Sequence, residues 1–248
     1  MILNIENLNL EIDEERLLKN VSFHMKKGEV VGLVGESGSG KTLTTKFILG
    51  ILPERSIIKY DKFEKNCKIG AVFQNAFISL NPTIKIGSQL KRLYESHYGN
   101  SQNWRDKIDF LLEKVGIKDI EKFLKKYPYE TSGGERQRVV IAGALIGEPD
   151  LLIADEVTTA LDLRTKKEVI NLFKEIRKNL GVSILFISHD LDSVRDFVDR
   201  VCVMYQGKIV EENSCKEIFE HQEHIYVKKL IGLSKTLWTR GDKDVFTS

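Results

Sequence analysis

The feature that most constrains the fold is an eight-residue, glycine-rich segment that directly follows a short apolar run. Residues 35–42 read Gly-Glu-Ser-Gly-Ser-Gly-Lys-Thr and match the pattern G-x-x-x-x-G-K-[ST], while Val30–Val34 is almost entirely apolar. A short strand of this kind is typical of a parallel sheet that is buried on both faces. The pattern therefore predicts a strand, a phosphate-binding loop and a helix from about Gly40 to Gly50, in that order.

The chemistry of this loop suits a polyphosphate ligand. Glycines let the backbone curl so that N–H groups face inward, and the helix N-terminus adds its positive end. We expect Lys41 to contact the β- and γ-phosphates and the Thr42 hydroxyl to ligate Mg²⁺. The alternative is a glycine-rich turn with an incidental lysine, which the strand–loop–helix context disfavours. The predicted nucleotide contacts are Gly35, Glu36, Ser37, Gly38, Ser39, Gly40, Lys41, Thr42 and Thr44.

Alternating strand and helix patterns predict an α/β fold with a mostly parallel core sheet. Leu151–Asp155 and Ser183–Ser188 are apolar runs, and a helical pattern over Leu163–Leu180 separates them, as in right-handed βαβ units. From Pro82 to about Leu145, apolar residues recur at helical spacing, which predicts an inserted helical lobe. The other predicted elements are strands over Ile2–Ile5, Leu8–Ile12, Val21–Met25, Ile69–Phe73, Val201–Tyr205 and Lys208–Glu211, and a helix over His221–Ile231.

Two adjacent acids end the strand that starts at Leu151. Successive strand residues point to opposite sides, so the Asp155 and Glu156 carboxylates serve different purposes. We expect Asp155 to hold Mg²⁺ and Glu156 to polarise the water that attacks the γ-phosphate, as a general base. Alone, the pair is equally consistent with a solvated strand end or a helix cap. The phosphate-binding loop favours the catalytic interpretation.

Composition excludes several functional classes. The 38 Lys+Arg and 36 Asp+Glu residues give a formal net charge of +2, which argues against a dedicated nucleic-acid-binding surface. Three cysteines without C-x-x-C spacing predict reduced thiols and neither a disulfide framework nor a zinc site. The first residues do not resemble a signal peptide. The most apolar run, Val139–Gly147, is too short to span a membrane.

A further motif links these features to a known family. Residues 131–138 read Thr-Ser-Gly-Gly-Glu-Arg-Gln-Arg and resemble the L-S-G-G-Q signature of ATP-binding cassette (ABC) ATPases. Gln74 after A-V-F, Ala160-Leu161-Asp162 and His189 in I-S-H-D match other motifs of that family, in the same order. The resemblance spans roughly residues 3–233. It implies a P-loop ATPase domain over residues 1–235, with a small antiparallel β subdomain and a helical subdomain inserted at about 82–145; residues 236–248 are expected to form a flexible tail.

The resemblance also implies roles for the motif residues, with ATP and Mg²⁺ as ligands. Two cassettes pair head to tail, so Ser132, Gly133 and Gly134 would close over the partner's ATP and Asp162 would lie at the seam. His189 would contact the γ-phosphate. Gln74, a metal ligand together with Thr42 and Asp155, would join the metal and water site to the helical lobe. Outside this set of motifs, a lone histidine or glutamine is usually structural or solvated.

Three short motifs resemble the cassettes that power peptide and nickel importers. They are Ser79-Leu80-Asn81-Pro82, Tyr127-Pro128-Tyr129 and His224-Ile225-Tyr226. The alternative for the first is a simple turn, which Asn-Pro favours. The subfamily implies a second cassette, identical or a sibling, an integral membrane permease and, indirectly, an extracellular solute-binding protein. It places the chain at the cytoplasmic face of the membrane, without nucleic acid, and leaves the cargo open between nickel, a metallophore and peptides.

The chain departs from the family pattern at several positions. Ile12 stands where an aromatic residue usually stacks on adenine, so we expect only apolar contact with the base. Thr131 replaces the usual Leu, and Glu135 replaces the usual Gln. The interval from Lys41 to Gln74 is short, which predicts a reduced antiparallel sheet. The chain lacks the cysteine-rich C-terminal extension of many peptide cassettes, which favours the nickel or metallophore type.

Two other functional classes were weighed. A cassette acting on DNA or ribosomes would carry a long coiled coil or a second phosphate loop, and the sequence has neither a long heptad run nor a second such loop. A binding module with an inactive ATP site would lack one of the catalytic side chains, whereas Lys41, Asp155, Glu156 and His189 are all present. Both classes are therefore less favoured than a transport ATPase.

Overall fold

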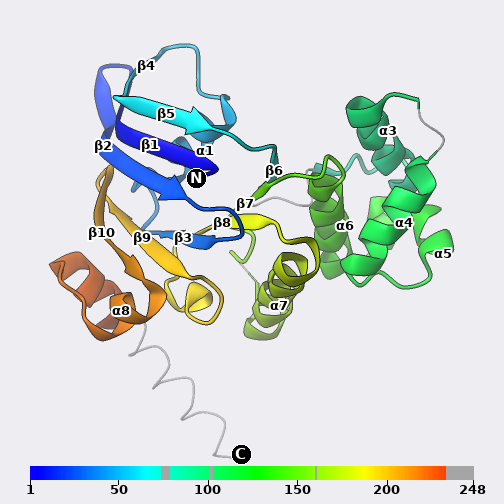
Figure 1. The fold of residues 1–248 in the computed structure, drawn as a ribbon. Helices are drawn as coiled ribbons and strands as arrows, with labels where there is room; N and C mark the ends of the chain where they lie inside the picture. Colours follow the sequence, from blue (N-terminus) through cyan, green and yellow to red (C-terminus); the bar gives the residue numbers. More distant parts are fainter. Residues whose placement is uncertain (74–78, 101–102, 160, 233–248) are drawn as a thin grey trace, which may run out of the picture. The chain divides into compact units, whose positions relative to one another are not determined.

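The computed structural model of the 248-residue chain describes residues 1–73, 79–100, 103–159 and 161–232 (Figure 1). The chain divides into two compact units. The first unit joins Met1–Asn66 to the segment that starts at Leu185, and the second is Cys67–Ile184. The predicted flexible tail, residues 236–248, lies outside the described residues.

An antiparallel sheet occupies the N-terminal part of the first unit. Strand β1 (Leu3–Ile12) lies between β2 (Glu15–Met25) and β4 (Ser56–Lys59), and β5 (Lys62–Lys65) also pairs with β1. Their pairing places buried residues opposite one another, for example Leu3 with Met25 and Leu8 with Val21. This matched burial fixes the register, because a one-residue slip would turn every apolar side chain to the opposite face.

Three details of this sheet differ from the sequence-based expectations. Residues 3–12 form one strand, not two, because Asn7 takes a left-handed conformation (φ 54°) at a register shift and lets the strand continue. Strand β2 begins at Glu15, six residues before the predicted start. Strands β4 and β5 were not predicted at all, since each has only four residues and mostly exposed side chains.

The second sheet of the first unit carries the predicted phosphate loop. Strand β3 (Val30–Val34) lies between β9 (Arg200–Tyr205) and β8 (Ser183–Ser188), and β10 (Lys208–Ser214) pairs with β9. Strands β3 and β9 run parallel, and β9 and β10 are antiparallel. All of β3 and β8 is buried, as their apolar sequences predicted. The sequence therefore placed the strand that leads into residues 35–42 correctly.

Helices complete the first unit. Helix α1 (Lys41–Leu49) follows the loop directly, as predicted, and ends at Gly50 in a left-handed conformation. Helix α8 (Cys215–Glu220), capped by the Ser214 hydroxyl, was not predicted. The expected helix over 221–231 instead spans 225–232 among the described residues, because α8 and a short extended stretch come first.

The second unit contains a parallel strand pair and a group of helices. Strands β6 (Ile69–Val72) and β7 (Leu151–Asp155) pair in parallel. Between them in sequence lie α3 (Ile86–Tyr98), α4 (Trp104–Lys114), α5 (Ile120–Leu124), the 3₁₀ turn η1 (Pro128–Glu130) and α6 (Gly133–Leu145). Helices α3, α4 and α5 contact one another, and α6 contacts α4 and β6. Residues 86–145 are thus largely helical.

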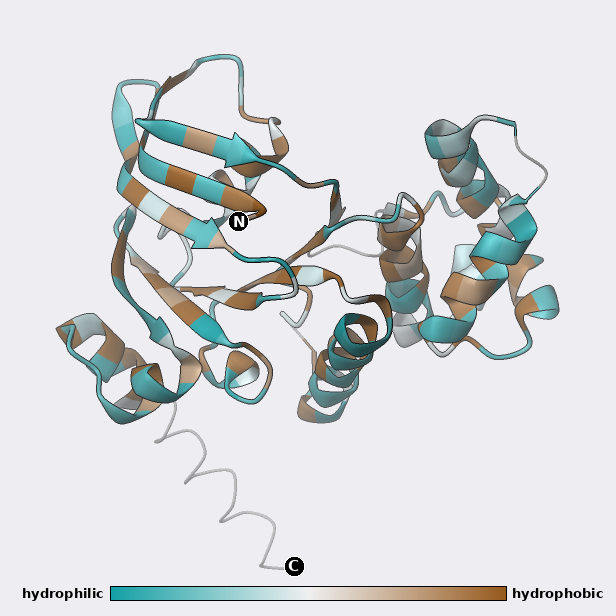
Figure 2. Ribbon diagram, viewed as in Figure 1, coloured by the Kyte–Doolittle hydropathy of each residue, from teal (hydrophilic) through white to brown (hydrophobic). Residues whose placement is uncertain are grey.

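Helix α7 (Leu163–Leu180) follows β7 and matches its predicted bounds. Its buried residues Val169, Leu172, Phe173 and Ile176 recur at helical spacing, so one face is apolar, while the remaining positions are largely polar (Figure 2). Within the described ranges, no helix combines the length and the apolar character needed to cross a bilayer.

Candidate nucleotide-binding site

The phosphate loop joins β3 to α1 and takes a backbone shape that glycine permits. Gly38 and Gly40 have φ values of 80° and 110°, a region that side chains rarely adopt. Lys41 is only 3% exposed, and its Nζ donates to the Gly35 carbonyl at 2.8 Å and the Glu36 carbonyl at 2.9 Å. The lysine ammonium is thus held inside the curve of its own loop.

The β9–β10 hairpin packs against the phosphate loop and is hydrogen-bonded to it. The Gly207 N–H donates to the Ser39 carbonyl at 3.0 Å. A Cβ atom placed on Gly35 would lie 2.2 Å from the Met204 carbonyl oxygen, so only glycine fits there. The Ser39 hydroxyl is buried and has no hydrogen-bond partner within the part of the chain that the structure describes. A buried polar atom of this kind, inside a glycine-lined curve with a lysine ammonium, fits a phosphate ligand.

Thr44, predicted to contact the nucleotide, uses its hydroxyl for a hydrogen bond within the first turn of helix α1. Its Oγ1 donates to the Gly40 carbonyl at 3.0 Å, and Thr44 is 1% exposed. His189 directly follows β8, and the preceding Ser188 carbonyl accepts from the Gly35 N–H at 3.4 Å. The turn after His189 is fixed by Asp190, whose carboxylate accepts from the Asp192 N–H at 3.0 Å. The first unit therefore holds the loop and His189.

The two predicted carboxylates end β7 in the second unit. Asp155 is 5% exposed, at the last residue of the strand. Glu156 has a φ of 51°, a left-handed conformation that costs energy in a non-glycine residue and is concentrated at functional sites. The Thr159 hydroxyl lies 3.3 Å from the Glu156 carboxylate and donates to it. The chain thus leaves the extended conformation of the strand directly after Asp155.

The segment that resembles the signature motif begins helix α6. Ser132 is the N-cap; its hydroxyl accepts from the Glu135 N–H at 3.2 Å, and the Glu135 carboxylate accepts from the Ser132 N–H at 2.8 Å. These two bonds form a capping box. The Ser132 N–H lowers the pKa of Glu135 more than burial raises it, and Lys126, 3.9 Å away, lowers it further. Glu135 therefore stays ionised at neutral pH.

Asp162 caps helix α7. Its carboxylate accepts from the backbone N–H groups of Arg164 and Thr165, both at 3.0 Å, and from the Thr165 hydroxyl at 2.6 Å. The Thr165 hydroxyl is the main reason that the pKa of Asp162 lies below its usual value. Gln74 and Ala160 of the other predicted motifs lie outside the described residues. Ile12 ends β1, half-buried, opposite Glu15 and Ser56.

Sequence reasoning missed one contact of the signature helix. Gln137, 8% exposed, donates through Nε2 to the Val157 carbonyl at 2.8 Å. Val157 directly follows Glu156, so this bond joins α6 to the segment that carries the predicted general base. Although Gln137 lies within the signature-like segment 131–138, its burial gave no sequence signal of its own, because amide side chains are usually exposed.

The strand, glycine loop, buried lysine and helix define a P-loop nucleotide-binding protein. Comparison with known proteins narrows the class. A family model described as ABC transporter matches residues 18–159. The chain belongs to this family, and it is an ABC ATPase, as the sequence motifs predicted.

Named relatives and solved structures agree with this assignment. The chain is 40% identical to the dipeptide transport ATP-binding protein DppD of Bacillus subtilis, over 93% of this chain and 76% of that protein. It is equally identical to the oligopeptide transport ATP-binding protein OppD of the same species, over 94% of this chain and 70% of that protein. It also resembles CbiO1 of Clostridium perfringens, part of the CbiONQ transporter complex (TM-score 0.75, 30% identity, 89% of this chain and 91% of that one).

A second solved structure is a dimeric ATP-binding cassette in a post-hydrolysis state with ADP and phosphate. Its TM-score is 0.69 at 27% identity, over 86% of this chain and 98% of that one. These structures confirm the predicted fold class, a P-loop ABC ATPase of α/β type. ATP binding is supported by the same findings.

The contact between Gly35 and Met204 yields a first prediction. Gly35→Ala should lower the free energy of unfolding by about 1–3 kcal/mol, because the new Cβ would overlap a backbone oxygen that has little room to move. Gly134→Ala is the matched control: its Cβ meets nothing within 4 Å, and alanine in a helix gains up to about 1 kcal/mol over glycine. Urea denaturation measures both; equal stability of the two variants would contradict the packing described.

The capping box of α6 yields a pH prediction. The folded-state pKa of Glu135 lies below its usual value, so its stabilising effect is complete above about pH 4.5 and is lost as the pH falls through the folded pKa. Glu135→Ala should cost about 0.3–1 kcal/mol at pH 7 and less at pH 3. Glu135→Gln, which keeps a neutral acceptor, should show a stability difference from the alanine variant that does not depend on pH. Denaturation at both pH values tests this; a pH-independent cost of Glu135→Ala would refute it.

Proposed function

We propose that this chain is the ATP-hydrolysing subunit of an importer that carries peptides across a membrane. The observation that carries the proposal is the complete phosphate loop, with its buried Lys41, in a chain that is 40% identical to dipeptide and oligopeptide transport ATP-binding proteins. The three short motifs at 79–82, 127–129 and 224–226 support the same subfamily. The ATPase domain is proposed to span residues 1–235, with the helical subdomain at about 82–145.

Binding of ATP begins with the exchange of partners at Lys41. The Nζ atom now donates to two carbonyls of the loop, which accept the bond but bring no full negative charge. A triphosphate offers charged acceptors, which form shorter and stronger bonds with an ammonium group. The inward N–H groups of residues 35–42, the Ser39 hydroxyl and the N-terminus of α1 would surround the phosphates. Ile12 would contact the adenine base through apolar surface.

The proposed metal ligands suit Mg²⁺. Thr42 supplies a hydroxyl, Asp155 a buried carboxylate and Gln74 an amide oxygen, and such oxygen ligands are preferred by this ion. When bound, Mg²⁺ neutralises charge that develops on the phosphates. Glu156 would orient and deprotonate the attacking water. His189 would contact the γ-phosphate from the end of β8.

Hydrolysis is proposed to require a second cassette, either a copy of this chain or a sibling. Ser132, Gly133 and Gly134 open α6, so their N–H groups and the helix dipole would attract the γ-phosphate bound by the partner. Asp162, at the start of α7, would lie at the seam between the two chains. The dimeric cassette with ADP and phosphate supports a paired arrangement. ATP drives pairing only through its greater affinity for the closed state.

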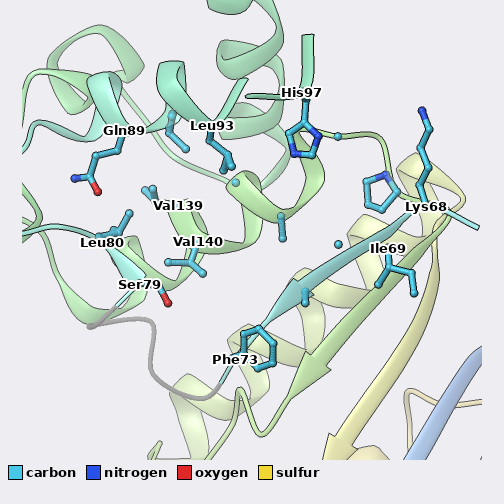
Figure 3. Close-up of a pocket in the computed structure, with 17 residues that line it drawn as sticks. Lys68, Ile69, Phe73, Ser79, Leu80, Gln89, Leu93, His97, Val139 and Val140 are labelled. Atoms are coloured by element: carbon cyan, nitrogen blue, oxygen red, sulfur yellow. The ribbon is translucent and has the colours of Figure 1, made fainter. Parts of the chain in front are cut away.

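A cavity of the second unit is the proposed docking surface for the permease (Figure 3). It has a volume of about 690 Å³ and is lined by β6 and by helices α3 and α6. Apolar side chains dominate it, and Leu93 and Phe73 are 38% and 40% exposed there. An apolar, partly open surface of this kind suits a protein partner. The occupant we propose is a short cytoplasmic segment of the permease, since the similar CbiO1 is part of a transporter complex.

This assignment places the chain at the cytoplasmic face of the membrane and makes an extracellular solute-binding protein an indirect partner. The names of the relatives favour peptides as cargo. Nickel or a metallophore stays the alternative cargo that the sequence favoured, and cargo contacts lie in other subunits. Isolation of the cognate binding protein and identification of what it holds would separate the two. A role on DNA or ribosomes is less favoured, because the relatives are transport proteins.

Replacing the proposed general base tests the catalytic roles. In the assembled transporter, Glu156→Gln should lower steady-state ATP hydrolysis by about 100-fold or more, since an amide cannot accept the proton. Equilibrium binding of ATP should stay within about twofold of the unchanged protein. Glu168→Gln, an exposed acid on α7, is the control and should hydrolyse ATP normally. Near-normal hydrolysis by Glu156→Gln would show that another group is the base.

A second experiment tests the docking surface. Leu93→Asp puts a charge into the apolar cavity, and we expect the tagged chain to lose its permease subunits on purification from membranes. Phe110→Asp changes an apolar residue of similar exposure on α4, outside the cavity, and should retain them. Basal ATP hydrolysis of the isolated chain should survive both changes. Retention of the permease by Leu93→Asp would rule out this surface.

A further inference from the structure

Tyr226 lies about 190 residues beyond the phosphate loop in sequence, yet it contacts the loop backbone. The Glu36 N–H donates to the Tyr226 hydroxyl at 2.9 Å. The same peptide group supplies the Gly35 carbonyl, which accepts from the Lys41 Nζ at 2.8 Å. One peptide group is therefore held from both ends, by the tyrosine hydroxyl on one side and by the lysine ammonium on the other. Hydrogen bonds joined in this way polarise and strengthen one another.

The Tyr226 side chain is itself held in position. Its ring stacks on Tyr205, the last residue of β9, with centroids 4.2 Å apart and planes inclined by 25°. Its backbone N–H donates to His224 Nδ1 at 3.2 Å, and the His224 N–H donates to the Glu211 carboxylate of β10 at 2.9 Å. These contacts fix the ring relative to the β9–β10 hairpin. Its hydroxyl is thus presented to the loop by a rigid support.

The same hairpin contacts the loop a second time. The Gly207 N–H, two residues beyond Tyr205, donates to the Ser39 carbonyl at 3.0 Å. The loop is therefore held at two points, at Glu36 by Tyr226 and at Ser39 by Gly207. Burial raises the pKa of the Tyr226 phenol above its usual value, so the hydroxyl stays neutral throughout the physiological range. It remains a hydrogen-bond acceptor for the Glu36 N–H under those conditions.

We propose that Tyr226 is a positioning residue for ATP: its hydroxyl fixes the Gly35–Glu36 peptide and so sets the loop and the Lys41 ammonium in the conformation that receives phosphates. The inference rests on the proposed ATP-binding role of residues 35–42. Without this hydroxyl the peptide keeps the Lys41 bond but loses its second anchor, and ATP must order that part of the loop as it binds. Ordering a binding loop in advance increases affinity without any new contact to the ligand. Tyr226 thus acts through the loop and not on ATP itself.

The test compares two identical substitutions within one stacked pair. Tyr226→Phe keeps the ring and removes the hydroxyl that accepts from the loop. Tyr205→Phe removes a hydroxyl that, among the described residues, accepts a hydrogen bond only from the Gln206 side chain, and it keeps the same stack. Isothermal titration calorimetry with a non-hydrolysable ATP analogue and Mg²⁺ measures the dissociation constant of the full chain. Steady-state hydrolysis supplies KM and kcat.

We expect Tyr226→Phe to raise the dissociation constant and the KM for ATP about three- to tenfold, with kcat within twofold and with the melting temperature of the nucleotide-free chain lowered by no more than about 4 °C, the effect of one lost hydrogen bond. Tyr205→Phe should match the unchanged protein in all four. Equal nucleotide affinities for the two variants would overturn the proposal. A lower melting temperature with unchanged affinity would also overturn it, since that outcome describes a structural role alone. If the unchanged chain failed to bind the analogue, that result would refute the ATP-binding role of the loop and not the role of Tyr226 alone.

Discussion

Lys41 carries a positive charge at a position that is only 3% exposed, and a buried charge is costly unless polar groups satisfy it. Two carbonyls of its own loop do so here, which requires the chain to curl tightly from Gly35 to Gly40. That curl is possible because Gly38 and Gly40 adopt positive φ and because Gly35 has no Cβ to meet the Met204 carbonyl. The ammonium, the curl and the glycines depend on one another, and a polyphosphate is the ligand that this arrangement suits.

The loop does not hold its conformation alone. The β9–β10 hairpin donates to it from Gly207, and Tyr226 accepts from it through a ring stacked on the hairpin. In the second unit, Gln137 joins the helix that begins with the signature segment to the backbone just beyond Glu156. In both units, residues distant in sequence hold the phosphate loop and the segment beyond Glu156 in place. The nucleotide chemistry of an ABC ATPase thus depends on a supporting set of contacts that the motifs do not include.

Much of the fold followed from local patterns. The apolar runs of β3, β7 and β8 and the helical period of α7 are signals within a few residues, so their bounds were predicted closely. The short strands β4 and β5 and the helix α8 were missed, because four to six residues are too few to give a clear period. The left-handed turns at Asn7 and Glu156 were also invisible, since tertiary context stabilises them.

The residues of the site divide in the same way, into those with a local sequence signal and those without one. The phosphate loop was predicted from its residue spacing and the signature segment from its resemblance to a family motif. The two acids were predicted from their place at the end of an apolar strand, together with that loop. The contacts of Tyr226 with Glu36 and of Gln137 with Val157 join residues distant in sequence, and no pattern in one sequence reports such pairs. The capping box between Ser132 and Glu135 could have been predicted from the sequence, since a serine followed three residues later by glutamate is its usual pattern.

We propose that ATP lies between the Lys41 loop of one cassette and the Ser132–Gly134 segment of another. A structure of the Glu156→Gln variant crystallised with ATP and Mg²⁺ tests it most directly. The account predicts a pair of chains with each γ-phosphate in contact with Lys41 of one chain and with Ser132 of its mate. Nucleotide bound away from residues 35–42, or bound there with residues 132–134 of every chain far from any phosphate, would contradict it.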